Sequence, residues 1–409
     1  MLEESTSAVQ SVLPSLNRSV MKFFSQQSTG LASSAPSKGK HLQTNTTSGK
    51  QIYSECIGHQ NLKDDAPDIT PDNVFSIASC TKLITSICAL QCIERGLTTL
   101  DEPVSKYLPE LDQLDIIGGT ASALTFSKPS KKVTLRQLLT HSSGLGYDAL
   151  HPLIIAWRES RGEKINELLN KLPIPEGANN PLVYEPGQGW EYGVSLDWAG
   201  LLIARLNKTT LEEYMKENIF KPLGMTSTSF YLESNPDMKK RWVSVCNRTP
   251  DGRLAELPGT IYPTPPVVEF GGHGLYSTPA DFIKVLADII SDSPKLLKLE
   301  TIENLMYKPQ FPGNSASLKG LEDGRAIVSG MTAKLSASAI NHGLGGLLCM
   351  NDDNMKNTLT WGGLANWVWF TNRERGFAAL YSSHMLPPAE PDSSKLEGAF
   401  IDEMFNRFG

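Results

Sequence analysis

The sequence predicts an α/β domain assembled from both ends of the chain, with a mostly helical domain inserted between them. Near the N-terminus a strand pattern is followed by a strong helix pattern, and helix patterns dominate the middle of the chain. From Gly343 onward, segments of alternating β-type residues return, and a helix pattern closes the chain. We therefore expect residues 1–96 and 266–409 to form the α/β domain and residues 97–265 the helical domain. Because active sites favour such junctions, the site is expected between them.

The N-terminal part of the chain contains three predicted elements. Residues 3–26 have the apolar spacing of an amphipathic helix, and residues 51–57 alternate as a strand does. Residues 28–50 are rich in Ser, Thr, Gly and Lys and are interpreted as a loop or a weak edge strand. From Ser79 onward, apolar side chains recur at three- and four-residue steps, which predicts a core helix with Gly96 as its stop.

In the middle of the chain, the clearest signal is a capping box at Thr134 and Gln137, which predicts the start of a short helix. Residues 113–132 contain Gly, Ser and Lys and are interpreted as a surface excursion. Further helix patterns cover residues 101–108, 148–175, 193–206 and 211–220.

The C-terminal part combines strands with two helices. Helix patterns cover residues 279–290 and 395–408. Residues 372–376 have the composition of a hairpin turn between two strands. Strand patterns cover residues 346–350, 358–360, 367–371 and 377–382.

The composition excludes several classes of protein. A net charge of −6 argues against nucleic acid and anionic membranes as main partners. No stretch reaches the roughly 18 apolar residues that a membrane-spanning helix needs, and the N-terminus lacks the apolar core of a signal peptide. The six cysteines form no C-x-x-C pair and no zinc spacing with histidine. We therefore expect a cytoplasmic, reduced protein without a metal or an organic cofactor.

Ser79 and Lys82 have the spacing S-x-x-K at the start of the predicted core helix. Residues three apart lie on one helix face, so the Lys82 amine can reach the Ser79 hydroxyl. A serine hydroxyl is a poor nucleophile until a neighbour accepts its proton, and a lysine accepts one only when it is neutral. Burial and the positive end of the helix dipole both favour a neutral lysine. Since the backbone N–H of Ser79 also faces outward, this stretch supplies a nucleophile, a base and half an oxyanion hole.

S-x-x-K alone is a weak pattern, and other residues must complete the chemistry. Tyr192 follows a tight Pro-Gly turn, so its phenol can be held at a fixed point and shared with Lys82. Trp361, Gly362 and Gly363 begin a strand. The two glycines let a substrate lie close to the backbone, and a strand N–H can serve as the second oxyanion donor.

Further candidates line the expected pocket. His141 and Tyr147 end a helix in a glycine-broken loop, where pocket residues often lie. We interpret Tyr147 as substrate-binding and His141 as a hydrogen-bonded structural residue. His273, within Gly-Gly-His-Gly, either lines the pocket or suits a turn. Trp361 is the tryptophan expected at the substrate, and Leu364, next to the glycine pair, is grouped with it.

These motifs together resemble the class C β-lactamase-like serine hydrolases, which include penicillin-binding-type enzymes, family VIII esterases and fungal acyltransferases. The resemblance places Ser79 on the acylated serine, Lys82 on its base and Tyr192 on the family tyrosine. It implies an antiparallel sheet flanked by helices, with a helical lobe. Over most of residues 51–382 the matching segments, in family order, are FSIASCTK, TLRQLLTHSSGLGY, EPGQGWEYGVSLDWAG, KPLGMTSTSF, GGHGLYSTPADF and WGG.

The chain departs from the family pattern at three places. Tyr192 is followed by Gly-Val, where β-lactamases carry Tyr-x-Asn. The third motif is Trp361-Gly362-Gly363, where penicillin binders have Lys-Thr-Gly. Both changes remove groups that hold a β-lactam, so β-lactamase activity is disfavoured and esters or thioesters are favoured. Residues 28–50 also lack the apolar first strand that the family usually has.

Within the family, the segments LITSICALQCIERGL, THSSGLGY and YGVSLDWAG resemble the lovastatin-pathway type of fungal acyltransferase. This resemblance implies transfer of an acyl group from a carrier-protein thioester, through the serine, to an alcohol on a polyketide. The implied partners are a small-molecule acyl donor and acceptor and an acyl carrier protein of a polyketide synthase. Residues 384–392, where such enzymes differ, match poorly, so the identities of donor and acceptor are not carried over.

Two alternatives to acyl transfer stay open. If water is the acceptor, the protein is an esterase or thioesterase, and the sequence does not show whether the site excludes water. If the chain is a catalytically inactive relative, it binds a ligand or partner instead, but the intact set of Ser79, Lys82 and Tyr192 argues against this. An α/β-hydrolase triad is not an alternative, because the chain has no G-x-S-x-G elbow.

Overall fold

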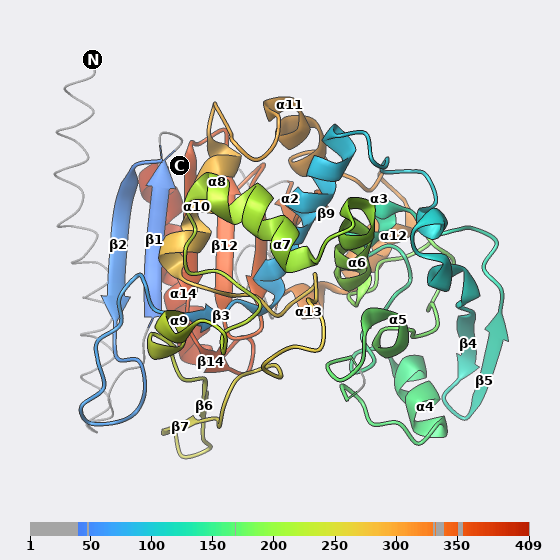
Figure 1. Cartoon of the computed structure of the whole chain (residues 1–409), viewed down its shortest axis with the longest axis horizontal. Coiled ribbons are helices and arrows are strands. Elements are labelled where there is room, and N and C mark those ends of the chain that lie inside the picture. The colour runs from blue at the N-terminus through green and yellow to red at the C-terminus, as the bar shows by residue number, and fades with distance from the viewer. Residues whose placement is uncertain are drawn as a thin grey trace.

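A seven-stranded antiparallel sheet occupies the left part of the molecule in the view of Figure 1. The structure is a computed structural model that describes residues 40–46, 49–167, 169–329, 332, 339–350 and 355–408. The helix predicted over residues 3–26 lies outside this described part. Among the described helices, none is both long and apolar enough to cross a membrane.

The order of the strands brings both ends of the described chain into one sheet. It runs β2–β1–β13–β12–β11–β10–β9, and every neighbouring pair is antiparallel. The antiparallel sheet implied by the family resemblance is therefore confirmed. The strands span Lys40–Thr46 (β1), Gln51–Ile57 (β2), Ile340–His342 (β9), Leu347–Cys349 (β10), Leu359–Gly363 (β11), Trp367–Asn372 (β12) and Phe377–Ser382 (β13).

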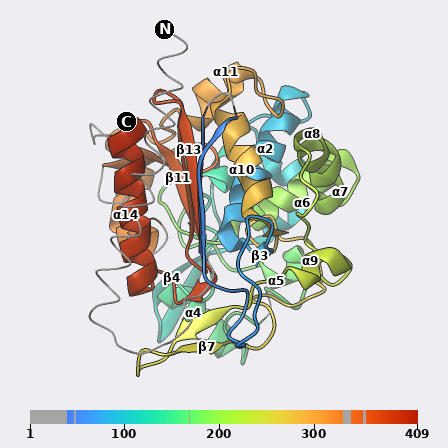
Figure 2. The same ribbon diagram turned by 90° about the vertical axis from the view of Figure 1, so that its left-hand side faces the viewer.

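Helices cover both faces of this sheet, as Figure 2 shows. Helix α14 (Pro391–Phe408) lies on one face, and α10 (Pro279–Ile290) and α2 (Thr81–Glu94) lie on the other. On β13, Tyr381 packs into the cluster formed with α14, whereas Leu380 belongs to the main core. Successive residues of a strand point to opposite faces, so both faces of β13 are apolar because both are covered.

Helix α2 runs through the middle of the main core. Every residue from Thr81 to Cys92 is buried, so the helix is covered all round rather than along the single apolar stripe that the sequence predicted. The α-helix begins at Thr81 rather than at Ser79, because Ala78–Cys80 forms a 3₁₀ turn before it. Gly96 follows the helix with φ of +68°, a backbone conformation that favours glycine, so the predicted stop is confirmed.

Most of the other helices come from the part of the chain between α2 and α10 (Figure 1). The predicted capping box at Thr134 and Gln137 is present at the start of α3, and α10 has the predicted bounds. The division of the chain into two domains stays a prediction. The helices span Leu135–Leu139 (α3), Pro152–Ser160 (α4), Ile174–Gly177 (α5), Ser195–Asn207 (α6), Leu211–Met215 (α7), Lys221–Leu223 (α8), Pro236–Lys240 (α9), Leu299–Thr301 (α11), Ala316–Asp323 (α12) and Arg325–Ser329 (α13).

Three small sheets complete the described structure. Strand β3 (Phe75–Ser76) pairs with β8 (Tyr276–Ser277), which joins the segment before Ser79 to the segment after Gly274. The other small sheets contain β4 (Ile116–Thr120) with β5 (Ala123–Ser127), and β6 (Cys246–Arg248) with β7 (Leu254–Glu256) and β14 (Met385–Leu386).

Two predictions of local structure were wrong. Residues 28–50 contain β1, which lies between β2 and β13 rather than at an edge, because both neighbours supply its backbone hydrogen bonds. Among the described residues of 148–175, only those of α4 and α5 are helical, since Gly162, with φ of +70°, follows the end of α4. The surface excursion predicted for residues 113–132 contains the largely exposed β4–β5 hairpin, in which Gly119 supplies a positive φ of +82° near the turn.

Candidate active site

Ser79 lies in the 3₁₀ turn that precedes α2, at the end of the short strand β3. The backbone N–H of Ser76 donates to Nε2 of the buried His384 at 3.2 Å, and the N–H of Ile77 donates to the carbonyl of Leu275 at 3.0 Å. Ala78 has φ of +45°, which is uncommon for a residue with a side chain. This turn therefore holds the half-buried Ser79 at a fixed point against the core.

Lys82 is buried, and its amine reaches three oxygen atoms. The Nζ atom donates to the carbonyl of Gly272 at 2.7 Å, to the Ser79 hydroxyl at 3.1 Å and to the Tyr147 hydroxyl at 3.3 Å. The side chain is only 4% exposed. A neutral amine has two N–H groups and one lone pair, so it can donate to Gly272 and Tyr147 while accepting the proton of Ser79. The geometry thus fits a lysine that acts as a base.

Tyr192 approaches the same serine from the segment before α6. Its hydroxyl donates to Ser79 Oγ at 2.7 Å, and Lys82 Nζ lies 4.8 Å from the centroid of its ring. The ring contacts His141, with 4.9 Å between centroids, and Trp361, with 5.5 Å. The structure therefore brings Ser79, Lys82 and Tyr192 into one hydrogen-bonded group, and the surrounding rings fix the position of the phenol.

Tyr147 contacts Lys82 and Tyr192 directly, in addition to its predicted place in the pocket. In addition to its contact with Lys82, its ring lies 5.4 Å from that of Tyr192, edge to face. Burial, and after it the charge of Asp197, raises the pKa of Tyr147 well above its ordinary value. Tyr147 is therefore a neutral hydroxyl that holds Lys82 in place.

The strand β11 passes directly beside the Ser79 turn. A Cβ atom on Gly363 would lie 2.5 Å from the carbonyl oxygen of Ile77, so only a glycine lets the strand approach this closely. Trp361 is only 2% exposed and stacks on His141, with 6.2 Å between centroids and 13° between planes. Gly362 pairs with Val368 within the sheet.

The predicted substrate-binding residues of this strand therefore differ in their exposure. Trp361 is packed behind Tyr192, whereas Leu364, just beyond the end of β11, is partly exposed. The glycine pair lies between them and contacts the Ser79 turn through Gly363.

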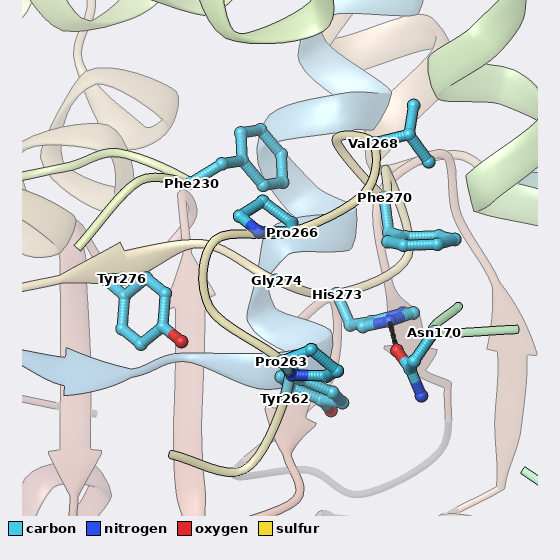
Figure 3. A pocket seen from close by; sticks show the side chains of 10 residues that line it. All are labelled: Asn170, Phe230, Tyr262, Pro263, Pro266, Val268, Phe270, His273, Gly274 and Tyr276. Carbon is cyan, nitrogen blue, oxygen red and sulfur yellow. Dashed lines mark hydrogen bonds between the residues drawn. The ribbon is translucent and has the colours of Figure 1, made fainter. Parts of the chain in front are cut away.

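His273 is buried beside the reacting group and not directly on it. Its Nε2 atom lies 3.2 Å from Asn170 Oδ1, and its Nδ1 atom lies 3.5 Å from Asp197 Oδ1 (Figure 3 shows the first contact). Burial first, and the nearby Lys82 charge second, lower the pKa of His273 to about 3. The ring is therefore neutral at physiological pH. Figure 3 also shows that it borders a pocket lined mainly by aromatic and proline side chains, among them Tyr262, Pro263, Pro266 and Phe270.

His141 has the buried position that its structural interpretation requires. It is 1% exposed and has φ of +56°, and burial lowers its pKa well below the ordinary value. Its carbonyl accepts hydrogen bonds from the N–H of Glu191 and from the hydroxyl of Tyr184. His141 thus positions the segment that carries Tyr192.

Asp197 is a part of the site that the sequence did not reveal. This fully buried carboxylate, in the first turn of α6, accepts the N–H of Gly272 at 2.8 Å. Burial raises its pKa to about 6, which the Lys82 charge opposes. Acidic residues are common in the first turn of a helix because they interact favourably with the helix dipole. The position of Asp197 in the sequence therefore did not indicate its contact with Gly272.

Comparison with known proteins finds relatives across almost the whole chain. A model of the β-lactamase family matches residues 44–400. The chain is 40% identical to the acyltransferase CalJ of Penicillium decumbens over 89% of this chain and 88% of that protein. It is 32% identical to a lovastatin esterase of Penicillium rubens over 88% of this chain and 92% of the relative. The structure of simvastatin synthase from Aspergillus terreus is similar with a TM-score of 0.79 and 31% identity, over 90% of this chain and 94% of that one.

Proposed function

The chain belongs to the β-lactamase family, and from this premise we propose that it is an acyltransferase that works through a Ser79 acyl-enzyme. The acyl group comes from a thioester or ester donor and passes to a small-molecule acceptor. One observation carries the proposal: the Ser79 hydroxyl contacts both Lys82 Nζ, at 3.1 Å, and the Tyr192 hydroxyl, at 2.7 Å. Such a serine has a base and a proton shuttle within hydrogen-bond distance.

In the first half of the proposed reaction, Ser79 takes the acyl group. Its Oγ atom attacks the acyl carbon while its proton moves to the neutral Lys82 amine. The new O–C bond forms, the C–S bond of a thioester breaks, and the proton reaches the leaving sulfur by way of Tyr192. The Tyr192 hydroxyl is suited to this step because it donates to the oxygen that has just reacted.

In the second half, the acceptor hydroxyl repeats these steps in reverse. It loses its proton to the Tyr192–Lys82 pair, its oxygen bonds to the acyl carbon, and the Ser79 O–C bond breaks. Ser79 Oγ recovers a proton and the free enzyme is restored. If water replaces the acceptor, the same steps release a carboxylic acid.

The negative oxygen that forms in both halves needs hydrogen-bond donors. We assign this role to the backbone N–H of Ser79 and to an N–H at the end of β11. The close approach of Gly363 to the carbonyl of Ile77 supports this assignment, because it holds the strand beside the Ser79 turn. Donors fixed in this way stabilise the developing charge without reorganising, and each contributes roughly 3 kcal/mol in enzymes of this kind.

The setting of the reaction follows from the relatives. One is named an acyltransferase, and the similar structure is a simvastatin synthase. We therefore propose a role in the polyketide secondary metabolism of a fungus. We also propose the cytoplasm as its location, and an acyl carrier protein, in place of a free thioester, as a source of the acyl group. The Tyr-Gly-Val and Trp-Gly-Gly motifs, without the groups that hold a β-lactam, support esters and thioesters as donors.

Hydrolysis is the second candidate function, since one relative of similar length is named an esterase. Incubation with a short acyl thioester and a panel of hydroxylated polyketides separates the two by chromatography of the products. We expect acyl ester to form faster than free acid with at least one acceptor. Free acid as the only product would contradict transfer and leave hydrolysis, and the absence of both products would contradict both.

A further inference from the structure

A buried carboxylate is connected to the proposed base through the backbone of one glycine. Asp197 Oδ1 accepts the N–H of Gly272 at 2.8 Å, and the carbonyl of the same residue accepts Lys82 Nζ at 2.7 Å. The second of these is the shortest of the three contacts that Lys82 makes. A single residue, Gly272, thus connects the carboxylate to the base through its own backbone.

We infer that Asp197 is a positioning residue for the reaction: it fixes the backbone of Gly272, whose carbonyl holds Lys82 over Ser79, and its charge acts on the Lys82 amine. This inference rests on the proposed function of Ser79 as a nucleophile. Asp197 itself does not touch a reacting atom, because it reaches Lys82 only through Gly272.

The packing around Gly272 shows how tightly this arrangement is built. A Cβ atom on Gly272 would lie 2.7 Å from Asp197 Oδ2, and one on Gly271 would lie 2.4 Å from the carbonyl of Leu196. From the other side, the Thr85 hydroxyl donates to the carbonyl of Gly271 at 2.7 Å. The glycine pair is therefore held between α2 and α6, and side chains at these two positions would force them apart.

The charges around Asp197 favour an ionic interaction with Lys82. The titratable groups that face it are Lys82 from α2, His273 from the glycine segment, and Tyr147 and Tyr262 from two loops. Burial lowers the pKa of His273 to about 3 and raises the pKa of both tyrosines, so these three are neutral near pH 7. Among these groups, Lys82 alone can carry a positive charge.

Besides accepting the Gly272 N–H, the Asp197 carboxylate affects the site through its charge. Burial raises the pKa of Asp197 to about 6, so it is ionised above that pH. An ionised carboxylate attracts positive charge, whereas the proposed reaction starts from a base that carries none. Removing the charge while keeping the hydrogen-bond acceptor should therefore extend activity to lower pH, whereas removing the acceptor should lower activity at every pH.

Two substitutions separate these effects. In Asp197→Asn the amide oxygen still accepts the Gly272 N–H but the charge is lost, and in Asp197→Ala both are lost. Asp288→Asn serves as the matched control, because Asp288 is also a buried carboxylate that accepts backbone N–H groups, but on α10 and from Lys295 and Leu296. Thermal melting of each variant shows whether it is folded.

The measurement is the rate at which a fluorophosphonate probe labels Ser79 between pH 5 and pH 9. We expect the acidic limb of the Asp197→Asn profile to move to lower pH by about one unit, as an opposite charge at close range predicts. We expect Asp197→Ala to be labelled at least about tenfold more slowly across the range, a loss of the size that a displaced catalytic group causes. The control should follow the wild type.

Two results would overturn the inference. If the pH profile of Asp197→Asn superposes on that of the wild type, the charge of Asp197 has no role. If a folded Asp197→Ala is labelled at the wild-type rate, Asp197 does not position the base. If Asp197→Ala does not fold, the Asn variant tests both roles: because its amide keeps the acceptor for the Gly272 N–H, a labelling rate far below that of the wild type across the whole pH range would overturn the positioning role. Failure of the proposed function is recognised separately, because the wild-type protein itself would then not be labelled at Ser79.

Discussion

The hydroxyl of Tyr192 lies 2.7 Å from the hydroxyl oxygen of Ser79, although 113 residues separate them in the sequence. The contact is possible because Ser79 precedes α2 and Tyr192 precedes α6, and these two helices pack against each other in the core. It places the phenol hydroxyl where a proton must enter and leave the serine oxygen in both halves of the proposed reaction.

Replacing Tyr192 by Phe removes this hydroxyl and leaves the ring in its packing against Trp190 and His141. We expect kcat for ester cleavage to fall by a factor of about 100 or more, the usual contribution of a general acid, while the melting temperature changes little. Tyr231→Phe is the control, since the Tyr231 hydroxyl donates to Glu269 and not to Ser79. A loss below about threefold in Tyr192→Phe would remove the tyrosine from the proton pathway.

Replacing Lys82 by Arg puts a permanent positive charge at the position of the base and removes the ability to become neutral. A guanidinium is not deprotonated in proteins, so it cannot accept the Ser79 proton. We expect acylation of Ser79 to fall below detection in Lys82→Arg. The exposed Lys221→Arg, which keeps an ion-pair partner in Glu217, should acylate at the wild-type rate. Normal acylation of Lys82→Arg, measured as a pre-steady-state burst, would show that Lys82 is not the base.

Gly363→Ala tests the close approach of β11 to the Ser79 turn. The added Cβ would meet the carbonyl of Ile77 at 2.5 Å, so the strand or the turn must move. We expect a loss of about 1–3 kcal/mol in the free energy of unfolding, measured in urea, together with slower acylation. Gly398→Ala in α14 meets no atom within 4 Å and should instead gain about 0.5–1 kcal/mol. Equal stability of the two variants would contradict the close packing.

Glu191, next to Tyr192, should make the stability of the fold depend on pH. Burial raises its pKa from 4.5 to about 7. A carboxyl with a higher pKa in the folded protein binds more protons when folded, so it costs stability increasingly as pH rises from about 4.5 to about 7. We expect Glu191→Gln to gain up to about 3 kcal/mol over the wild type across this window, and the exposed Glu159→Gln to gain nothing. Parallel curves for Glu191→Gln and the wild type, from urea unfolding at several pH values, would contradict the raised pKa of this partly buried carboxyl.

The sequence predicted best what depends on neighbouring residues. The capping box at Thr134 involves side chains three residues apart, and the bounds of α10 follow from its apolar spacing and its cap at Thr278. The pair of Ser79 and Lys82 also lies within one helical turn, so its contact follows from spacing alone. The Pro-Gly turn before Tyr192 made it a candidate, and the family resemblance assigned its role, because no local pattern places it beside Ser79.

What the sequence could not predict depends on packing between distant segments. Strand β1 has the sequence KHLQTNT, which lacks apolar alternation, yet it is an inner strand because β2 and β13 pair with it on both sides. The contact of Asp197 with Gly272 joins residues 75 positions apart, and the burial of Trp361 behind Tyr192 depends on the stacking of His141. Such contacts follow from the assembled core and not from any single segment.

The central claim is that Ser79 carries the acyl group in a covalent intermediate. Intact-protein mass spectrometry after incubation with a short acyl thioester tests it most directly, with the wild type and Ser79→Ala compared in parallel. We predict that the wild type gains the mass of one acyl group, that Ser79→Ala gains none, and that an added acceptor alcohol discharges the adduct. Turnover of the thioester without any adduct on the wild type, or an equal mass gain in Ser79→Ala, would contradict the covalent mechanism.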